Sequence, residues 1–236
     1  MDAYLKAGGH GLSAANRSPL RACYVHDTAG VRIVALDTAC PAGGADGCID
    51  HAQLAWLEDR LAEVHSSYVG PGGETVRTGR SNHLVVIASH HPLVAMRNER
   101  GPDGSGAAAL LAVLRRFPNV ILWLNGHTHT NKVRPHPNRE GISVGFWEVT
   151  TSSLVDWPCQ GRLVEIFDAG GRLAIASTMI DHDGAVDSKD ALTQQEMAGL
   201  HRELAANDPL AGAASARAGT AADRNVVLTL PAPFRL

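Results

Sequence analysis

The sequence predicts an α/β fold, and two buried strands joined by a helix carry most of that prediction. Residues 84–89 (LVVIAS) and 120–125 (VILWLN) are continuous apolar runs of strand length. Strands that are apolar on both faces are typical of parallel sheets, and a strand, helix, strand order gives a parallel pair with a right-handed crossover. The carboxyl ends of both strands should therefore lie at one edge of a sheet, where open α/β sheets bind ligands.

The helix between these strands is predicted from about Ser105 to Phe117, and Pro118 stops it. Its apolar side consists of Leu110, Leu111, Leu114 and Phe117. Residues 66–82, before the first strand, are polar and glycine-rich and are expected to form a loop.

The segment that precedes this unit predicts a hairpin and a further helix. Residues 22–37 (ACYVHDTAGVRIVALD) hold two β-rich runs around a turn, and the second run reads as a buried strand that ends at Asp37. Asp50 and Gln53 then stand three apart as a capping box. The apolar residues that recur at helical spacing after them are Leu54, Leu57, Leu61 and Val64.

Downstream, three short strands separated by turns predict an antiparallel meander that builds a second sheet. These strands are GFWEVT (145–150), GRLVEIFD (161–168) and RLAIASTMI (172–180). Thr193 and Glu196 form another capping box, before a helix with Met197, Leu200 and Leu204 on one face. The Ala/Gly-rich residues 211–222 are expected to be loosely ordered. The chain thus divides into a core, residues 1–184, and a C-terminal part, residues 185–236, with a helix and a loosely ordered tail.

Composition narrows the class of partner. The net charge is −3 with both signs interspersed, which gives no extended basic surface for nucleic acid or an anionic membrane. A small-molecule partner is expected instead, while the oligomeric state stays open. The chain as written has no membrane-spanning run and no targeting signal, so its compartment is open. Cys40 and Cys48 flank a glycine-rich loop and could form a local disulfide or remain two thiols.

Histidines are the candidate functional residues. Six are scattered on polar stretches and are expected at the surface: His10, His65, His83, His136, His182 and His201. Four others follow the two buried strands, namely His90 and His91 in His-His-Pro, and His127 and His129 in Gly-His-Thr-His. A single histidine at a strand end is usually a polar residue leaving the core. Three imidazoles that meet at one sheet edge, His90, His127 and His129, make a site for a divalent transition metal.

Three further polar residues lie beside these motifs. His91, Asp37 and Asn125 are candidates to contact the metal ligands or a substrate, although Asp37 reads equally well as a residue that starts a turn.

The combination of motifs resembles the second half of the calcineurin-like metallophosphoesterases, over roughly residues 20–183. A strand that ends in His-x-Pro, a helix, and a strand that ends in Gly-His-x-His match that family's late motifs. The resemblance implies half of a four-layer α/β/β/α sandwich with mixed sheets, in which His90 and His127 bind one metal and His129 the other. It also implies a dinuclear centre of Zn, Mn or Fe in intact members. A bacterial subgroup with long inserts, often with a twin-arginine export signal, is similar.

The family's early motifs, Asp-x-His, Gly-Asp-x-x-Asp and Gly-Asn-His, do not occur in this sequence. We therefore expect a truncated core. Two divalent cations about 3.5–4 Å apart repel by about 18 kcal/mol at an effective dielectric of about 20. Three neutral imidazoles do not offset that repulsion, so we expect these residues alone to hold one cation at most.

The resemblance implies a metal-dependent hydrolase of phosphate monoesters or diesters, in which the histidines hold metal and a metal-activated water attacks. The first alternative is a non-catalytic relative that keeps the fold and one weak metal site. A third reading, a mononuclear three-histidine zinc enzyme, needs carboxylates around the ligands that the sequence does not identify.

Overall fold

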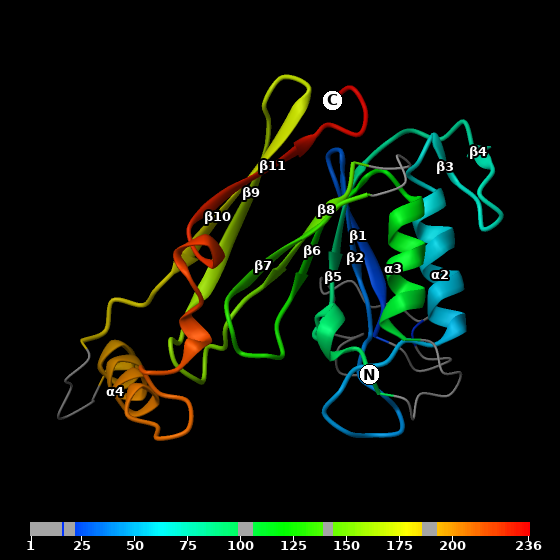
Figure 1. Cartoon of the computed structure of the whole chain (residues 1–236). Coiled ribbons are helices and arrows are strands. Elements are labelled where there is room, and N and C mark those ends of the chain that lie inside the picture. The colour runs from blue at the N-terminus through cyan, green and yellow to red at the C-terminus, as the bar shows by residue number, and fades with distance from the viewer. Residues whose placement is uncertain (1–15, 17–21, 99–105, 139–143, 186–192) are drawn as a thin grey trace. The chain divides into compact units, whose positions relative to one another are not determined.

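The structure is a computed structural model that describes residue 16 and residues 22–98, 106–138, 144–185 and 193–236 (Figure 1). His10 and the predicted helix start at Ser105 lie outside these residues. The chain divides into two compact units. The first comprises residues 1–124, 135–147 and 233–235, and the second comprises residues 125–134, 148–232 and 236. No helix in the described ranges is long and apolar enough to cross a bilayer.

A mixed six-stranded sheet carries the strands that precede the histidine motifs, and it confirms the predicted α/β class. Its strands are β1 (Tyr24–Thr28), β2 (Val31–Ala35), β5 (Leu84–Ala88), β6 (Val120–Asn125), β7 (Lys132–His136) and β8 (Phe146–Thr150). Their order across the sheet is β1-β2-β5-β6-β8-β7. β1 and β2 form the predicted antiparallel hairpin, whereas β2, β5 and β6 run parallel. Ala88 lies opposite Leu124, so β5 and β6 end at the same edge, as predicted.

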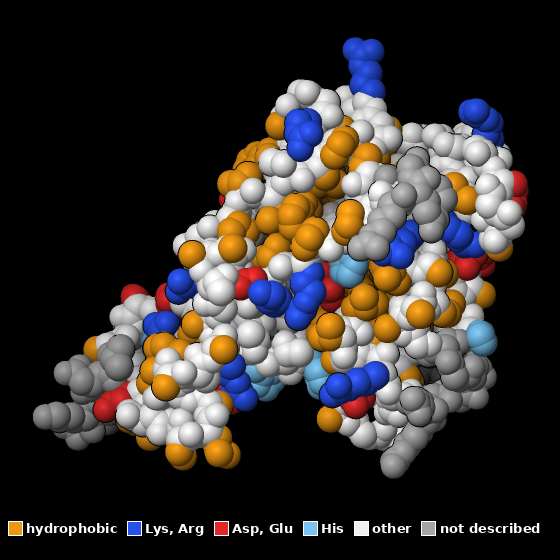
Figure 2. Space-filling view, in the orientation of Figure 1, with side chains coloured by type: hydrophobic (Ala, Val, Ile, Leu, Met, Phe, Trp, Pro, Cys, Tyr) orange, Lys and Arg blue, Asp and Glu red, His pale blue; other side chains and the backbone are white. Residues whose placement is uncertain are grey.

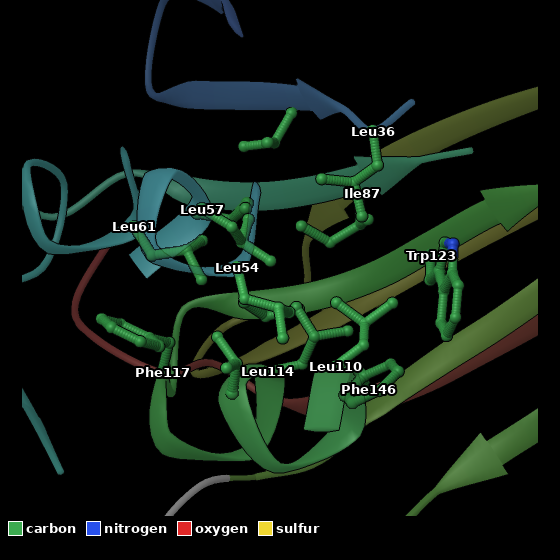
Figure 3. Packing of buried hydrophobic residues seen from close by; sticks show 14 of the residues in the cluster. Leu36, Leu54, Leu57, Leu61, Ile87, Leu110, Leu114, Phe117, Trp123 and Phe146 are labelled. Atoms are coloured by element: carbon green, nitrogen blue, oxygen red, sulfur yellow. The ribbon is translucent and has the colours of Figure 1, made fainter. Parts of the chain in front are cut away.

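Two helices, α2 (His51–Ala62) and α3 (Ala107–Arg116), lie side by side against this sheet (Figure 1). Their buried leucines meet Ile87 and Trp123 in one apolar cluster, which Figure 3 shows from close by. These leucines are Leu54, Leu57 and Leu61 from α2 and Leu110 and Leu114 from α3. Because burying one such side chain contributes about 2 kcal/mol, the cluster fixes the helices on the sheet.

The start of α2 corrects one sequence prediction. Asp50 caps the helix, since its Oδ1 accepts a hydrogen bond from Gln53 N at 2.8 Å. The Gln53 side chain does not complete a capping box, however. Its Oε1 accepts from Asp37 N at 2.8 Å and its Nε2 donates to Asp37 O at 2.7 Å. Gln53 therefore ties the end of the β2 segment to the first turn of α2.

Residues 66–82, predicted as a loop, contain a short hairpin of β3 (Ser67–Val69) and β4 (Thr75–Arg77). A hydrogen bond from Gly70 N to Glu74 O, 2.7 Å long, closes its turn. Tyr68 stacks on Phe117 with ring centroids 4.6 Å apart. Phe117 is far from Tyr68 in the sequence, so the polar, glycine-rich pattern of residues 66–82 could not predict this contact. The 3-10 turn η2 (Leu93–Ala95) follows the His-His-Pro motif.

The second unit contains a three-stranded antiparallel sheet in the order β11-β10-β9. Its elements are β9 (Gly161–Asp168), β10 (Arg172–Ile180), α4 (Gln194–Ala206), the 3-10 turns η3 (Ala216–Ala218) and η4 (Ala221–Asp223), and β11 (Val226–Pro231). β9 and β10 pair as the predicted meander. Within residues 211–222, which the sequence predicts to be loosely ordered, η3 and η4 occupy a part, and after them β11 pairs along β10.

The assignment of residues 145–150 to the second sheet was also wrong, because β8 lies between β6 and β7 in the six-stranded sheet. Phe146 and Val149 are both buried, so β8 is covered on both faces, unlike a strand with one solvated face.

Helix α4 has the predicted capping box of Thr193 and Glu196. Its predicted apolar face is largely solvent-exposed, since Met197 and Leu204 are 59% and 65% exposed. Figure 2 shows hydrophobic side chains at the surface in the region of α4. The buried residue of this helix is Gly199, where an added Cβ would collide with the Ala185 backbone.

His65, predicted at the surface, is fully buried. Its Nδ1 is 2.6 Å from Leu61 O and its Nε2 accepts from Asn119 N at 3.0 Å, so both ring nitrogens have backbone partners. The ring also meets Phe117 edge-on, with centroids 5.1 Å apart. Burial lowers the pKa of His65 to about 4. The neutral ring thus joins α2 to the turn before β6.

The buried His65 ring predicts a pH-dependent stability. In the unfolded chain an imidazole titrates at about 6.5, so below that pH the unfolded state binds a proton that the folded state excludes. The free energy of unfolding should therefore fall by up to about 3 kcal/mol as pH drops from 7 toward 4. Urea unfolding followed by tryptophan fluorescence at several pH values measures this slope.

The matched variants are His65→Gln, which removes the titrating group, and His51→Gln at an exposed position on α2. We expect His65→Gln to be less stable at pH 7 but to have a flatter pH dependence, and His51→Gln to follow the wild-type curve. An equal slope in wild type and His65→Gln would contradict the assignment.

Candidate metal centre

The end of β5 is held to β6 by Ser89. Its backbone N–H donates to Leu124 O at 3.0 Å, and its hydroxyl accepts from Trp123 Nε1 at 2.8 Å. The same hydroxyl donates to His91 O at 2.8 Å. The backbone that carries His90 and His91 is therefore fixed at the sheet edge.

Buried asparagines clamp the loop after β6 at both ends. Asn125 accepts from Thr150 Oγ1 at 2.6 Å and donates to Glu148 Oε1 at 3.1 Å. Asn131 Oδ1 accepts from Ser152 N at 2.9 Å, and Asn131 N donates to Arg217 O at 2.9 Å. The Gly-His-Thr-His motif thus lies between two anchored residues.

The histidines of this loop have unusual backbone conformations. His127 and His129 have φ values of 66° and 52°, in the left-handed region that non-glycine residues seldom occupy. Each of these left-handed residues destabilises the fold by about 1 kcal/mol or more. The hydrogen bonds of Asn125 and Asn131 hold the loop in this conformation. Backbone strain of this kind clusters at functional sites, so the backbone conformation by itself makes the motif a candidate functional site.

Both histidine motifs follow strands that end at the same edge of the six-stranded sheet, because β5 and β6 pair in parallel. In the first motif the rings of His90 and His91 meet edge-on, with centroids 4.7 Å apart. His90 is exposed, His127 is half-buried and His91 is buried. Their imidazole nitrogens are of the kind that could hold a metal ion.

Hydrogen bonds oppose a ligand role for His91. Its Nε2 is 3.0 Å from Ala45 O, and because a carbonyl only accepts, this nitrogen must carry the proton. Its Nδ1 then accepts from the Thr38 hydroxyl at 2.8 Å. With its one ring lone pair engaged by Thr38, His91 serves to hold the 38–47 loop against the chain after β5.

His129 has a different partner. Its Nδ1 lies in hydrogen-bond contact with Asp156 Oδ2, and the same carboxylate is 2.9 Å from Arg217 Nη1. Asp156 and Asn131 were not predicted from the sequence, because nothing in their local pattern separates them from other loop residues.

The two remaining candidates have structural partners. Asp37 accepts from Ala22 N at 3.0 Å and from Ala39 N at 3.2 Å, which is the geometry of a residue that starts a turn. Asn125 is buried, and its side chain is hydrogen-bonded to Glu148 and Thr150.

Comparisons with known proteins give a partial match. The chain is 32% identical over 136 residues to a probable cyclic nucleotide phosphodiesterase of Synechococcus sp. (strain WH7803). The match covers 56% of this chain but only 45% of that protein, so the chain spans about half of its length. A crystal structure of a dimetal phosphatase from Danio rerio aligns with a TM-score of 0.44 and 15% identity, over 69% of this chain and 59% of the other. No family model matches the chain.

The packing of His91 against its loop predicts that a side chain added at Gly47 destabilises the protein. A Cβ at this position would lie 2.5 Å from Cγ of His91, while Gly47 N is bonded to Ala95 O at 2.8 Å. Gly47→Ala should therefore lower the free energy of unfolding by about 1–3 kcal/mol. Urea denaturation measures the change. Gly161→Ala, where nothing lies within 4 Å, is the control and should stay within about 0.5 kcal/mol of wild type. Equal losses in both variants would contradict this packing.

Proposed function

We propose that this chain, which resembles the C-terminal half of the calcineurin-like metallophosphoesterases, is the histidine-bearing portion of a divalent-metal-dependent hydrolase of phosphate esters. The observation that carries the proposal is the parallel pairing of β5 with β6, which brings the strand ends before the His-His-Pro and Gly-His-Thr-His motifs to one edge of the sheet. The left-handed backbone at His127 and His129 supports it independently.

The donor set fits a transition metal. Neutral imidazole nitrogen suits zinc and iron, and manganese tolerates it. In this assignment His90 and His127 bind one cation and His129 faces the position of a second. His91 keeps its bonds to Thr38 and Ala45 and holds the loop beneath the ligands. When bound, the metal lowers the pKa of a coordinated water and so supplies the nucleophile.

A phosphodiester is the substrate class that we favour. The Synechococcus relative is named a probable cyclic nucleotide phosphodiesterase, and this supports a diester over a monoester. Because the match covers only part of that protein, we propose a class of substrate, phosphodiesters, and no particular compound.

A non-catalytic metal-binding relative is the second candidate function. It is favoured by the absence of the family's early Asp motifs from the sequence. Without those carboxylates a second cation is unscreened, so the chain alone should bind a second metal ion more weakly than the first and turn over little substrate. Binding of inorganic phosphate by the zinc-loaded chain would favour the hydrolase over this alternative.

We predict that Zn²⁺ or Mn²⁺ binds the purified chain and that His127→Ala weakens binding at least tenfold, because one of the proposed imidazole ligands is lost. Calorimetric titration measures the affinity. His136→Ala, whose ring stacks on Phe146 in the sheet, is the control and should bind as wild type does. Affinity should also fall as pH drops below about 6.5, since imidazole must be neutral to coordinate.

The same preparations assayed with an aryl phosphate monoester and diester should show negligible turnover. Robust turnover abolished by His127→Ala would show that these ligands suffice for catalysis and that our account of the missing carboxylates is wrong. Absence of metal binding would overturn the metal site itself.

A further inference from the structure

His129 and Asp156 form a carboxylate–histidine pair that joins the Gly-His-Thr-His loop to the segment between β8 and β9. The Nδ1 of His129 is in contact with Asp156 Oδ2, and the two side chains are 38% and 31% exposed. Both residues belong to the second unit. The pair is therefore accessible to a ligand.

We propose that Asp156 is a positioning residue that fixes the tautomer and orientation of His129, so that His129 presents Nε2 to a metal ion. The inference rests on the proposed function, since it concerns how one of its metal ligands is held. It adds a residue that no sequence motif in the chain marks.

The chemistry of the pair supports this role. An ionised carboxylate only accepts hydrogen bonds, so the contact places the proton of a neutral His129 on Nδ1. The free lone pair then lies on Nε2. Metal-binding histidines commonly donate their other ring N–H to a carboxylate in this way, which fixes the ring and raises the basicity of the ligating nitrogen.

Asp156 is itself held from several directions. Asp156 N donates to Ser153 Oγ at 3.3 Å, and Asp156 O accepts from Cys159 N at 2.8 Å. Arg217 Nη1 lies 2.9 Å from the carboxylate. Since Arg217 O accepts from Asn131 N, the same residue also anchors the end of the histidine loop.

Helix α4 supports the segment that carries Asp156. His201 Nε2 lies 3.0 Å from Val155 O, and the Arg202 guanidinium lies 5.7 Å from the centre of the Trp157 ring. The residues on both sides of Asp156 thus contact one helix. A carboxylate fixed in this way can impose an orientation on a histidine, whereas a mobile surface ion pair cannot.

The test reads the tautomer of His129 in the metal-free protein by ¹⁵N NMR at about pH 8, where an unperturbed imidazole is neutral. We expect the Nδ1–H form in wild type and a shift toward Nε2–H in Asp156→Ala. Arg217→Gln removes the other partner of the carboxylate and should keep the Nδ1–H form. Asp156→Leu, whose side chain also accepts no hydrogen bond, replaces Asp156→Ala if the latter does not fold.

Zinc titration of the same variants supplies the second readout. The His129 ring signals report its own zinc site, separately from the cation held by His90 and His127. We expect the zinc concentration that half-saturates these signals to rise about 10–100-fold in Asp156→Ala. An Nε2–H tautomer in wild type, or an unchanged tautomer in the Asp156 variant, would overturn the inference. Failure of wild type to bind zinc would instead refute the proposed function, while the tautomer measurement would still decide the role of Asp156.

Discussion

Parallel pairing of β5 with β6 is the constraint on which the site depends. Because Ala88 lies opposite Leu124, the chain leaves both strands at the same edge of the sheet. Ser89 reinforces this register through its bonds to Leu124 O and Trp123 Nε1. The leucines of α2 and α3 pack against this pair from one side, so apolar burial fixes the strand ends that carry the histidine motifs.

Neutrality of the donors is the second physical theme. Imidazoles give a cation nitrogen ligands without charge. A ring nitrogen can bind the cation only if it carries no proton, and the hydrogen bonds around the ring decide which nitrogen carries the proton. His91 is engaged at both nitrogens, so its contact with His90 does not make it a ligand. His129 has a carboxylate at one nitrogen, and its other nitrogen is the one that we propose for coordination.

Much of the fold follows from local patterns, and what does not follow is non-local. The continuous apolar runs predicted β5 and β6, and the leucine spacing predicted α2, because these signals lie within one element. The position of β8 was missed because it depends on which strand Phe146 and Val149 pack beside. His65 was misplaced because its partners, Leu61 O and Asn119 N, are backbone groups that only the folded chain brings together. Asp156 escaped for the same reason, since it is separated by 27 residues from His129.

Anomalous diffraction at the zinc absorption edge, from crystals of the chain grown with zinc, tests the central claim most directly. The account predicts a peak at bonding distance, about 2.0–2.1 Å, from ring nitrogens of both His90 and His127, with the Thr38–His91–Ala45 hydrogen bonds intact. A peak that His91 ligates in place of either residue, or zinc bound only elsewhere on the chain, would contradict it.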